Sequence, residues 1–397
     1  MKKSFSNNKI VVSGAVIHNV MNIHFRFFLL LYGSFLYSLE NNINLLFVFD
    51  LIPFLLLGPF LGKVIDQVNR KSLLIIASSI AVLLRFVTIL FIILNSLNFV
   101  FLLFIVGISG LNTSFYQLSE SSYFPIFINK FNLAKLNGFL FMITSLSVII
   151  FPNISFILNQ EVWVLTSLII SLILSLYSLV IFLLAPSAKE EKVMPEKTVT
   201  KNRSGIIYVF RNKSLLIALG IVLLGNFFNA PLEYLIIDYY SRRGIAERVG
   251  ILLMFSGVGS FFASLLTMLW KEKIKGDLIL LVSAISLMTG SLLFITFTII
   301  FQYLGLMIIS FGLSLRILYL ITFRQLKTDI SLLGSVNTLF KYIAFGIAPL
   351  SIYLFGFLKS HFSTQLLLAF CAIGFGIVGV LEFYTITRTK LLSLEVD

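Results

Sequence analysis

The chain has 397 residues, of which 58% are hydrophobic and 12% are charged, and its net charge is +13. Soluble globular proteins have about 25% charged residues, so this composition excludes a soluble globular protein. A single cysteine, Cys371, excludes a disulfide framework and a cysteine-built metal site. We therefore expect no metal and no cofactor.

Stretches of about 20 apolar residues are long enough to cross a membrane as helices, and the chain contains twelve of them. They cover residues 11–36, 45–62, 72–94, 99–118, 138–158, 162–184, 215–237, 249–270, 278–301, 304–323, 334–358 and 364–387. The first carries several polar residues, and the fourth fades into a polar segment. The predicted fold class is all-α integral membrane, with twelve transmembrane helices.

Basic residues alternate between the two sides of these predicted spans. With the N-terminus placed inside, 22 of the 30 Lys and Arg residues fall on cytoplasmic segments and four on outer loops. Such an asymmetry sets the orientation of a membrane protein, so we expect a multi-pass protein with both termini in the cytoplasm. The positive charge then reflects topology, and we expect the lipid bilayer, not nucleic acid, as its partner. No small-residue cleavage site follows the first lysines, which favours a cytoplasmic tail over a signal peptide.

The longest polar stretch, residues 186–214, follows the sixth predicted span. It divides the chain into a six-helix half at 1–185, a cytoplasmic linker and a second six-helix half at 215–397. Two six-helix halves are the layout of many secondary transporters. Residues 205–210 are apolar enough to lie on the membrane as an interfacial helix.

A short charged turn, GPFLGKVIDQVNRKSLL, joins the second and third predicted spans. Gly62, Asp66, Arg70 and Lys71 follow the spacing G-x-x-x-D-x-x-x-R-K within it. Gly62 would let another helix approach closely, and Asp66 can cap the N-terminus of a helix. Arg70 and Lys71 would hold the turn in the cytoplasm. A turn this short predicts that the two helices are antiparallel neighbours.

This turn resembles the signature loop between helices 2 and 3 of the major facilitator superfamily of transporters. Gln67 and Asn69 depart from the family pattern, which usually has a basic residue and a glycine there. Asn adopts a left-handed backbone more readily than most residues, so we expect the turn to survive. The resemblance implies the major facilitator fold with two six-helix halves.

Further segments resemble the macrolide-efflux branch of this superfamily, which contains drug exporters of Gram-positive bacteria. They read GPFLGKVID, NAPLEYLI, GVGS and LGSVNT. The resemblance implies an efflux antiporter linked to antibiotic resistance, acting as a monomer in the bacterial cytoplasmic membrane. Two features common in proton-linked relatives are missing: an arginine inside span 4, and a Gly-Pro motif in span 5, where Phe151-Pro152-Asn153 stands. Both departures count against drug:proton antiport.

Polar residues form a stripe on the first helix of each predicted half. The stripes consist of His18, Asn22 and Arg26 in the first span and of Asn226, Asn229 and Glu233 in the seventh. The spacing places each set on one helix face. A polar group inside a membrane needs a partner or a water-filled cavity, so we predict that both stripes line a cavity for a partly polar substrate. The alternative is that the Asn residues only hold helices together.

Arg26 and Asp50 each lie roughly 18 Å from the inner ends of two consecutive, antiparallel spans. We therefore predict an ion pair or a water-bridged contact between them. In one interpretation the pair couples transport to protons, because protonation of Asp50 would free Arg26. In the other it is a permanent structural pair. Glu233, just after Pro231, could bind a proton or a cationic substrate, or lie at the rim of the passage.

Two further basic residues, Arg316 in the tenth span and Lys341 in the eleventh, lie at similar predicted depth. They would favour an anionic group between them, or a nearby carboxylate such as Glu120 or Glu382. If they face the cavity, an anionic or zwitterionic substrate is favoured. The alternative is that these long side chains extend towards the membrane surface.

The sequence therefore predicts a secondary active transporter that exports a drug-like or amphipathic small molecule by alternating access. Protons would drive it through Asp50 and Glu233. The alternative is a transporter of a specific metabolite or peptide-like product without proton coupling. A membrane-embedded enzyme is the remote alternative, because no H-x-x-x-H motif, paired carboxylates or phosphate-binding loop accompanies the three histidines.

Overall fold

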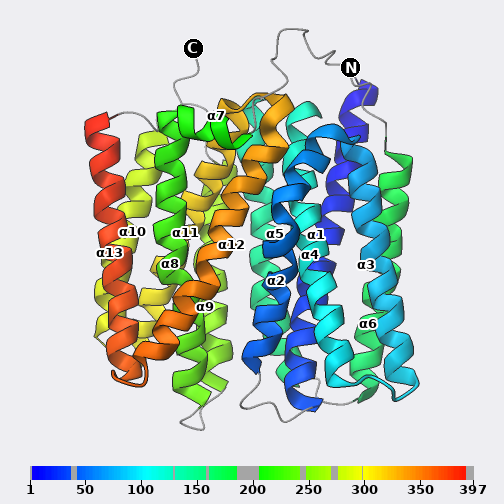
Figure 1. Cartoon of the computed structure of the whole chain (residues 1–397), viewed down its shortest axis with the longest axis horizontal. Helices are drawn as coiled ribbons and strands as arrows, with labels where there is room; N and C mark the ends of the chain where they lie inside the picture. The colour runs from blue at the N-terminus through cyan, green and yellow to red at the C-terminus, as the bar shows by residue number, and fades with distance from the viewer. Residues whose placement is uncertain are drawn as a thin grey trace. The chain divides into compact units, whose positions relative to one another are not determined.

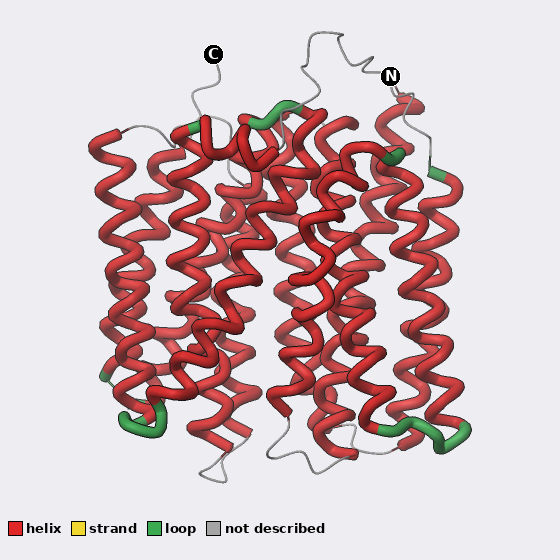
Figure 2. Tube along the Cα trace, viewed as in Figure 1, coloured by secondary structure: helices red, strands yellow, loops and turns green. Residues whose placement is uncertain are grey.

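The computed structural model describes residues 2–36, 43–127, 130–157, 161–185, 205–241, 247–269, 276–296 and 298–389. Within these ranges the chain is helical, and its helices are joined by short turns (Figures 1 and 2). Helices satisfy their own backbone hydrogen bonds, which is what a chain must do inside a lipid bilayer.

Twelve of the described helices have 20 residues or more, and α7 is a short one. The helices are α1 (Lys2–Leu36), α2 (Ile43–Gln67), α3 (Arg70–Ile93), α4 (Phe99–Phe127), α5 (Lys130–Ile157), α6 (Glu161–Leu184), α7 (Gly205–Arg211), α8 (Lys213–Ser241), α9 (Glu247–Leu269), α10 (Gly276–Ile295), α11 (Ile299–Lys327), the 3-10 turn η1 (Ile330–Leu332), α12 (Leu333–Leu358) and α13 (Thr364–Thr389).

Ten of the described helices are long and apolar enough to cross a membrane, or eleven if α2 is one bent span. The bend in α2 measures 61° and falls between Val48–Gly58 and Phe60–Gln67. The remaining long helix, α1, carries the polar stripe that made the first predicted span atypical. The predicted all-α integral membrane fold is therefore confirmed.

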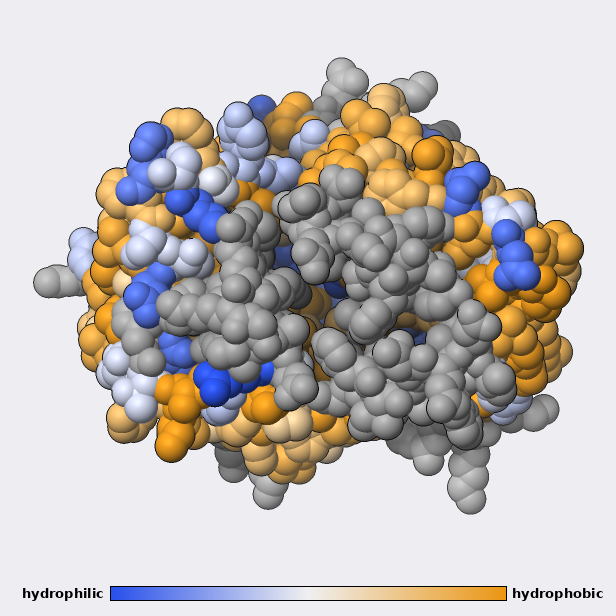
Figure 3. Space-filling view, turned by 90° about the horizontal axis from the view of Figure 1, so that it is seen from below, coloured by the Kyte–Doolittle hydropathy of each residue, from blue (hydrophilic) through white to orange (hydrophobic). Residues whose placement is uncertain are grey.

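Hydrophobic side chains cover the outer sides of the described helices. Leu56, Phe60, Val100 and Leu292 are all at least 66% exposed in the isolated chain. An end-on view likewise shows hydrophobic residues around most of the outer edge, with hydrophilic residues in smaller groups (Figure 3). A water-soluble protein rarely exposes so much apolar surface, so the hydrocarbon of the bilayer is the solvent for these sides.

The chain forms two compact units. Unit 1 comprises residues 1–129, 151–206 and 328–342, and unit 2 comprises residues 130–150, 207–327 and 343–397. Each unit includes a segment from the other side of the predicted linker, so the units do not simply follow chain order. The predicted boundaries at 185 and 215 stay a prediction, and linker residues 186–204 lie outside the described residues. The predicted interfacial helix at 205–210 corresponds to α7.

In unit 1, α4 packs against α1, α2 and α3, and α6 packs against α1 and α3. The shared core includes Phe25, Leu29, Leu46, Leu102 and Leu168. The two helices predicted to be antiparallel neighbours, α2 and α3, are joined by a short turn, and each packs against α4.

In unit 2, α11 packs against α9 and α10, and α13 packs against α8 and α10. Its core includes Leu235, Leu287, Ile309 and Phe375, all fully buried. Small residues allow close helix contact: a Cβ atom at Gly290 would lie 2.8 Å from the backbone nitrogen of Ile309. Helix α5 joins this unit through Asn137, which donates hydrogen bonds to Thr322 Oγ1 (3.0 Å) and Gln325 Oε1 (2.8 Å) of α11.

Gly110 of α4 lies directly against the backbone of Asp50 in α2, and a Cβ atom there would overlap the Asp50 carbonyl oxygen. We predict that Gly110→Ala destabilises the protein by about 1–3 kcal/mol, because helix backbones cannot yield as a flexible side chain can. Thermal unfolding of the purified protein in detergent measures this. Gly356→Ala is the matched control, since nothing lies within 4 Å of its Cβ position. Equal stability of the two variants would contradict the prediction.

Candidate functional site

Arg26 of α1 and Asp50 of α2 form an ion pair in unit 1, with Arg26 Nε donating to Asp50 Oδ2 at 2.9 Å. The predicted pairing is therefore confirmed. The Asp50 side chain is only 9% exposed, whereas that of Arg26 is 49% exposed. One member of the pair is thus held among helices while the other reaches an open surface.

The other members of the α1 stripe are buried in helix contacts. His18, 1% exposed, stacks on Tyr116 of α4 with ring centroids 3.7 Å apart, and its Nδ1 lies 3.3 Å from Ser78 Oγ of α3. Asn22, 8% exposed, accepts a hydrogen bond from Arg85. The role of the stripe in lining a cavity stays a prediction. Residues four apart differ by about 40° around a helix, so His18 and Arg26 face different neighbours.

Arg85 is buried in the middle of unit 1 at 1% exposure. Its guanidinium donates to Asn22 Oδ1 (3.0 Å), Ser171 Oγ (3.0 Å) and the Ala81 carbonyl (2.8 Å), and it lies over the ring of Phe25. All of these partners are neutral, so within the described part of the chain no carboxylate contacts this cation. It links α1, α3 and α6 through hydrogen bonds alone.

Glu120 of α4, which the sequence suggested only as a carboxylate near Arg316 or Lys341, forms a second carboxylate site in unit 1. Its Oε1 accepts hydrogen bonds from Asn19 Nδ2 of α1 (2.9 Å) and from the hydroxyl of Tyr116 one turn back in α4 (3.3 Å). The predicted span ended at residue 118, whereas α4 continues to Phe127. The i, i+4 spacing of Tyr116 and Glu120 is the signal that could have identified the site, since such residues share a helix face.

Lys341 of α12 extends to α4 within unit 1. Its Nζ donates to Gln117 Oε1 at 2.7 Å and to the Ser114 carbonyl at 3.3 Å, and it lies 5.5 Å from the centre of the Phe54 ring. Its charge also interacts with the carboxylates of Asp50 and Glu120. The sequence suggested that a carboxylate could lie near Lys341. The structure places two there, Asp50 and Glu120.

The signature turn makes a second set of contacts between α2 and the start of α12. Asp66 accepts hydrogen bonds from the backbone nitrogens of Gly334 (2.8 Å) and Ser335 (2.9 Å) and from the Ser335 hydroxyl. The predicted capping role is confirmed, and the helix that Asp66 caps is α12. A Cβ atom at Gly62 would lie 3.1 Å from Ser335 Cα, so the predicted close helix approach is confirmed too. We call these contacts of Asp66 the α2–α12 latch.

The basic residues of the turn bind backbone carbonyls. Arg70 donates to the carbonyls of Ser122 (2.9 Å) in α4 and Ile330 (2.6 Å) in η1, and it interacts electrostatically with Asp66. Lys71 donates to the carbonyls of Leu183 (3.2 Å) and Ala185 at the end of α6. The cytoplasmic placement predicted for them stays a prediction.

The turn survives with Asn69 in it, as expected, but not through a left-handed backbone. The φ of Asn69 is −56°, and its side-chain oxygen caps α3 by accepting from the backbone nitrogens of Lys71 (2.9 Å) and Ser72 (3.4 Å). Asn is among the residues preferred at a helix N-cap.

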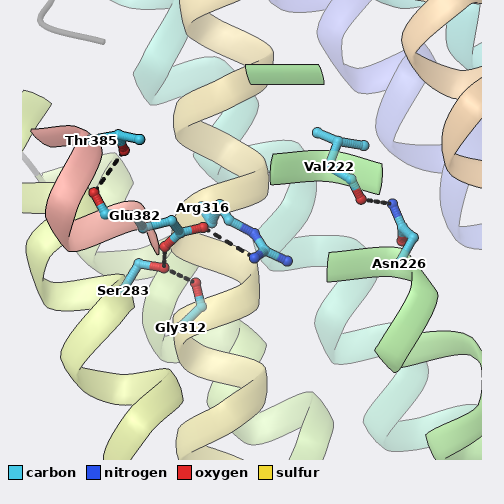
Figure 4. A network of polar contacts seen from close by, with 7 residues as sticks. All are labelled: Val222, Asn226, Ser283, Gly312, Arg316, Glu382 and Thr385. Atoms are coloured by element: carbon cyan, nitrogen blue, oxygen red, sulfur yellow. Dashed lines mark hydrogen bonds and ion pairs between the residues drawn. The ribbon is translucent and has the colours of Figure 1, made fainter. Parts of the chain in front are cut away.

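Unit 2 contains a buried ion pair between α11 and α13. Arg316 Nη1 lies 3.1 Å from Glu382 Oε1, and the two side chains are 5% and 0% exposed (Figure 4). Ser283 of α10 donates to Glu382 Oε2 at 3.3 Å. The predicted carboxylate partner of Arg316 is thus Glu382, and its charge is balanced by the protein itself. A Cβ atom at Gly225 of α8 would overlap the Arg316 guanidinium, so α8 closes over it.

The second polar stripe lies on α8 in the same unit. Asn226 donates to the carbonyl of Val222, one turn back in its own helix, at 2.9 Å (Figure 4). Asn229 is exposed. Glu233 belongs to the helix, but its side chain lies outside the described residues. The cavity-lining role of this stripe stays a prediction.

These groups are held by opposite charges and by hydrogen bonds. Among the described residues, no three His, Cys, Asp or Glu side chains are close enough to hold a metal ion. The ionisable groups instead form separate pairs and networks inside an apolar helix bundle. Such groups inside a membrane mark substrate or ion pathways.

Comparisons with known proteins agree on one fold. The family model of the Major Facilitator Superfamily matches residues 19–350. The chain is similar to a solved bacterial homologue of the iron transporter ferroportin in an outward-facing state, with 14% identity, 96% of this chain and 98% of that chain covered and a TM-score of 0.72. It is also similar to the human organic anion transporter TETRAN, with 15% identity, 94% and 99% covered and a TM-score of 0.74.

A further solved structure with the same fold is the Escherichia coli fucose:proton symporter, with 12% identity, 95% of this chain and 98% of that chain covered and a TM-score of 0.69. At these identities the likeness shows the fold alone. No significant match is found among curated protein sequences.

The buried pair in unit 2 gives a prediction about stability. Glu382→Gln should destabilise the protein by about 3 kcal/mol or more, because it leaves the Arg316 cation buried without an anion. The double variant Arg316→Met/Glu382→Leu should lose less than the single variant, since it leaves no uncompensated charge. Denaturant unfolding in detergent measures both. A double variant as unstable as Glu382→Gln would contradict this account.

Proposed function

This chain belongs to the major facilitator superfamily of membrane transporters, and we propose that it exports a drug-like or amphipathic small molecule by alternating access, driven by protons. It is a transporter and not an enzyme. The observation that carries the proposal is the Arg26–Asp50 ion pair. It joins two adjacent helices of an apolar bundle and has one buried and one open member.

The Arg26–Asp50 pair supports proton coupling through its chemistry. Arg26 offers only hydrogen-bond donors and remains charged, so protonation of Asp50 removes the charge attraction and leaves at most a neutral hydrogen bond. Protonation of Asp50 would weaken its hold on Arg26, and the Arg26 guanidinium could then bind water or an anionic group. Glu233 of α8 is the proposed counterpart in the second half, as a further proton carrier.

The α2–α12 latch supports alternating access. Asp66 holds the first turn of α12 by three hydrogen bonds, and a carboxylate at a helix N-terminus is stabilised by the helix dipole. Because α12 lies beyond the linker, the latch joins the two proposed six-helix halves. We propose that it holds one end state and opens when the halves rock about the central site.

Export of drug-like molecules is supported by the segments that resemble the macrolide-efflux branch. His18, Asn22, Asn226, Asn229, Arg316 and Lys341 remain the proposed polar contacts of the passage. Arg26 and Asn229 are exposed in the described part of the chain, so we propose that these two contact the substrate directly.

The second candidate function is transport of a specific anionic or zwitterionic metabolite or peptide-like product without proton coupling. Arg85 favours it, because this buried cation has only neutral partners within the described part of the chain. The missing span 4 arginine and Gly-Pro motif favour it too. The likeness to an organic anion transporter is compatible with this candidate.

We propose that the protein acts as a monomer in the bacterial cytoplasmic membrane with both termini inside. The distribution of Lys and Arg supports this orientation, with 22 of 30 on the proposed inner segments. Accessibility of single cysteines introduced into the loops, in a Cys371→Ala background, tests the orientation.

The proposed function is tested by transport into and out of vesicles that contain the purified protein, with and without an imposed pH gradient. Cationic, neutral and anionic candidates are compared. Accumulation of amphipathic compounds against their gradient, only when the pH gradient is present, is the expected result. Uptake of an anionic metabolite that ignores the pH gradient would support the second candidate instead.

We predict that Asp50→Asn removes most of the dependence of transport on the pH gradient, because the amide cannot ionise and cannot hold Arg26 by charge. The matched control is Glu382→Asp, which keeps a carboxylate in the buried pair of unit 2. The folded fraction of Glu382→Asp should retain pH-dependent transport. Unchanged pH dependence in Asp50→Asn would rule out a coupling role for Asp50.

We predict that Asp66→Ala lowers the transport rate about tenfold while the apparent substrate affinity changes little. Loss of charge-assisted hydrogen bonds costs roughly 1.5–3 kcal/mol, and here the loss falls on one end state and not on the binding site. Initial rates over a range of substrate concentrations separate the two quantities. Asp66→Asn, which keeps one acceptor oxygen, should be intermediate. A wild-type rate for Asp66→Ala would contradict the latch.

A further inference from the structure

Glu120 differs from Asp50 in the kind of partners that it has. Asp50 is paired with a permanent cation, whereas both groups bonded to Glu120 are neutral: the Asn19 amide and the Tyr116 hydroxyl. Within the described residues, no hydrogen bond reaches its second oxygen, Oε2. The Glu120 residue is half-buried. Water can therefore deliver a proton to Glu120 without breaking an ion pair.

The neutral partners of Glu120 suit both of its protonation states. A tyrosine hydroxyl can donate a hydrogen bond to a carboxylate and can accept one from a carboxylic acid after its hydrogen rotates. The Asn19 amide donates to an oxygen that is present in either state. Protonation of Glu120 therefore leaves no buried group unsatisfied, whereas protonation of Asp50 leaves Arg26 without its anion.

Lys341 connects Glu120 to a helix on the far side of the linker. Its amine is held by Gln117 and by the Ser114 carbonyl, on α4 one and two turns before Glu120. Lys341 also lies six residues along α12 from Ser335 of the α2–α12 latch, or about 9 Å. Asn337, between them in sequence, donates to Ser121 Oγ at 3.2 Å. The first turns of α12 thus contact α4 beside Glu120 and α2 at Asp66.

We propose that Glu120 is a second proton-binding carboxylate of this transporter, and that the charge of Lys341 ties its ionisation to the docking of α12 on α4. With Glu120 ionised, attraction holds Lys341 and the first turns of α12 in place. With Glu120 protonated, that attraction is lost and α12 is released more easily. This inference rests on the proposed alternating access and deepens it, because it links proton binding to the contact that must open.

The other charged and titratable groups near Glu120 are consistent with this assignment. Helix α1 contributes His18, stacked on Tyr116, and Arg26; α2 contributes Asp50; α3 contributes Arg70 and Arg85; and α12 contributes Lys341. Arg26 is committed to Asp50, Arg85 to Asn22 and Ser171, and Arg70 to backbone carbonyls and Asp66. The positive charge of Lys341 attracts the Glu120 carboxylate.

The proton site can be tested without knowing the substrate. Dicyclohexylcarbodiimide modifies protonated carboxylic acids in apolar surroundings, and peptide mass spectrometry of the full-length protein in lipid vesicles locates the modified residue. Glu120 should be modified, with the modified fraction falling as the pH rises. Glu120→Gln should remove this signal and leave any modification of other carboxylates unchanged. Absence of modified Glu120 at every pH where the protein is folded would overturn the proposal.

The link to α12 is tested by variants of Lys341. A nearby cation favours the ionised carboxylate, so Lys341→Met should extend the modification of Glu120 to higher pH by about one unit. Lys341→Arg keeps the charge and should restore the wild-type profile. Arg26→Gln, the matched control in α1, should move the Glu120 profile less than Lys341→Met does. An identical profile in Lys341→Met and the wild type would overturn the link, and if Lys341→Met does not fold, Lys341→Gln takes its place.

Transport with an imposed pH gradient separates this inference from the proposed function. Failure of the wild type to respond to the gradient, together with Lys341-dependent modification of Glu120, would overturn the proposed coupling and leave the proton site standing. Gradient-driven transport that is unchanged in Glu120→Gln but lost in Asp50→Asn would overturn the role of Glu120 and leave the proposed function standing.

Discussion

The structure depends on one constraint, which is the high cost of leaving a polar group without a partner in hydrocarbon. Helices meet this constraint for the backbone. The ionisable side chains meet it in three ways: with an opposite charge, as in Arg316–Glu382; with neutral hydrogen-bonding groups, as for Arg85; or with an open surface, as for Arg26. These three environments differ in how easily the side chain can gain or lose a proton or change its partner. Groups that can do so are candidates for coupling, and the others are structural.

The same constraint explains the role of the turn after α2. Asp66 does not cap the helix that follows it in sequence, because Asn69 already caps α3. The carboxylate is therefore available to the start of α12, and Arg70 is available to the carbonyl of η1. A motif that looks local in sequence thus serves a contact between segments more than 260 residues apart. Together with Lys341 it holds the first turns of α12 against α2 and α4.

Much of the fold could be predicted from the sequence, because hydrophobic length and basic loops report directly on membrane spans. The Arg26–Asp50 pair was predictable for a related reason. The depth of each residue in the membrane follows from its distance along the helix, and consecutive antiparallel helices bring residues of equal depth together. Glu120 and Tyr116 lay at the end of a span that was predicted too short. The orientation of His18 and Asn22 could not be read from spacing, because a stripe at i, i+4, i+8 rotates around the helix. The packing of both α2 and α3 on α4 could not be read from the length of the turn that joins them.

Arg85 also has a consequence for how the protein is made. Helix α3 emerges from the ribosome before α6, so the guanidinium enters the membrane well before Ser171 exists to bind it. An arginine at the centre of an inserting helix costs roughly 2.5–3.5 kcal/mol on translocon scales, which the strongly apolar remainder of α3 can offset. Until α6 arrives, Asn22 of α1 is the side chain able to shield it. We therefore expect α1 to associate with α3 during membrane insertion. Helix α6 would pack against them later, when Ser171 accepts its hydrogen bond from Arg85.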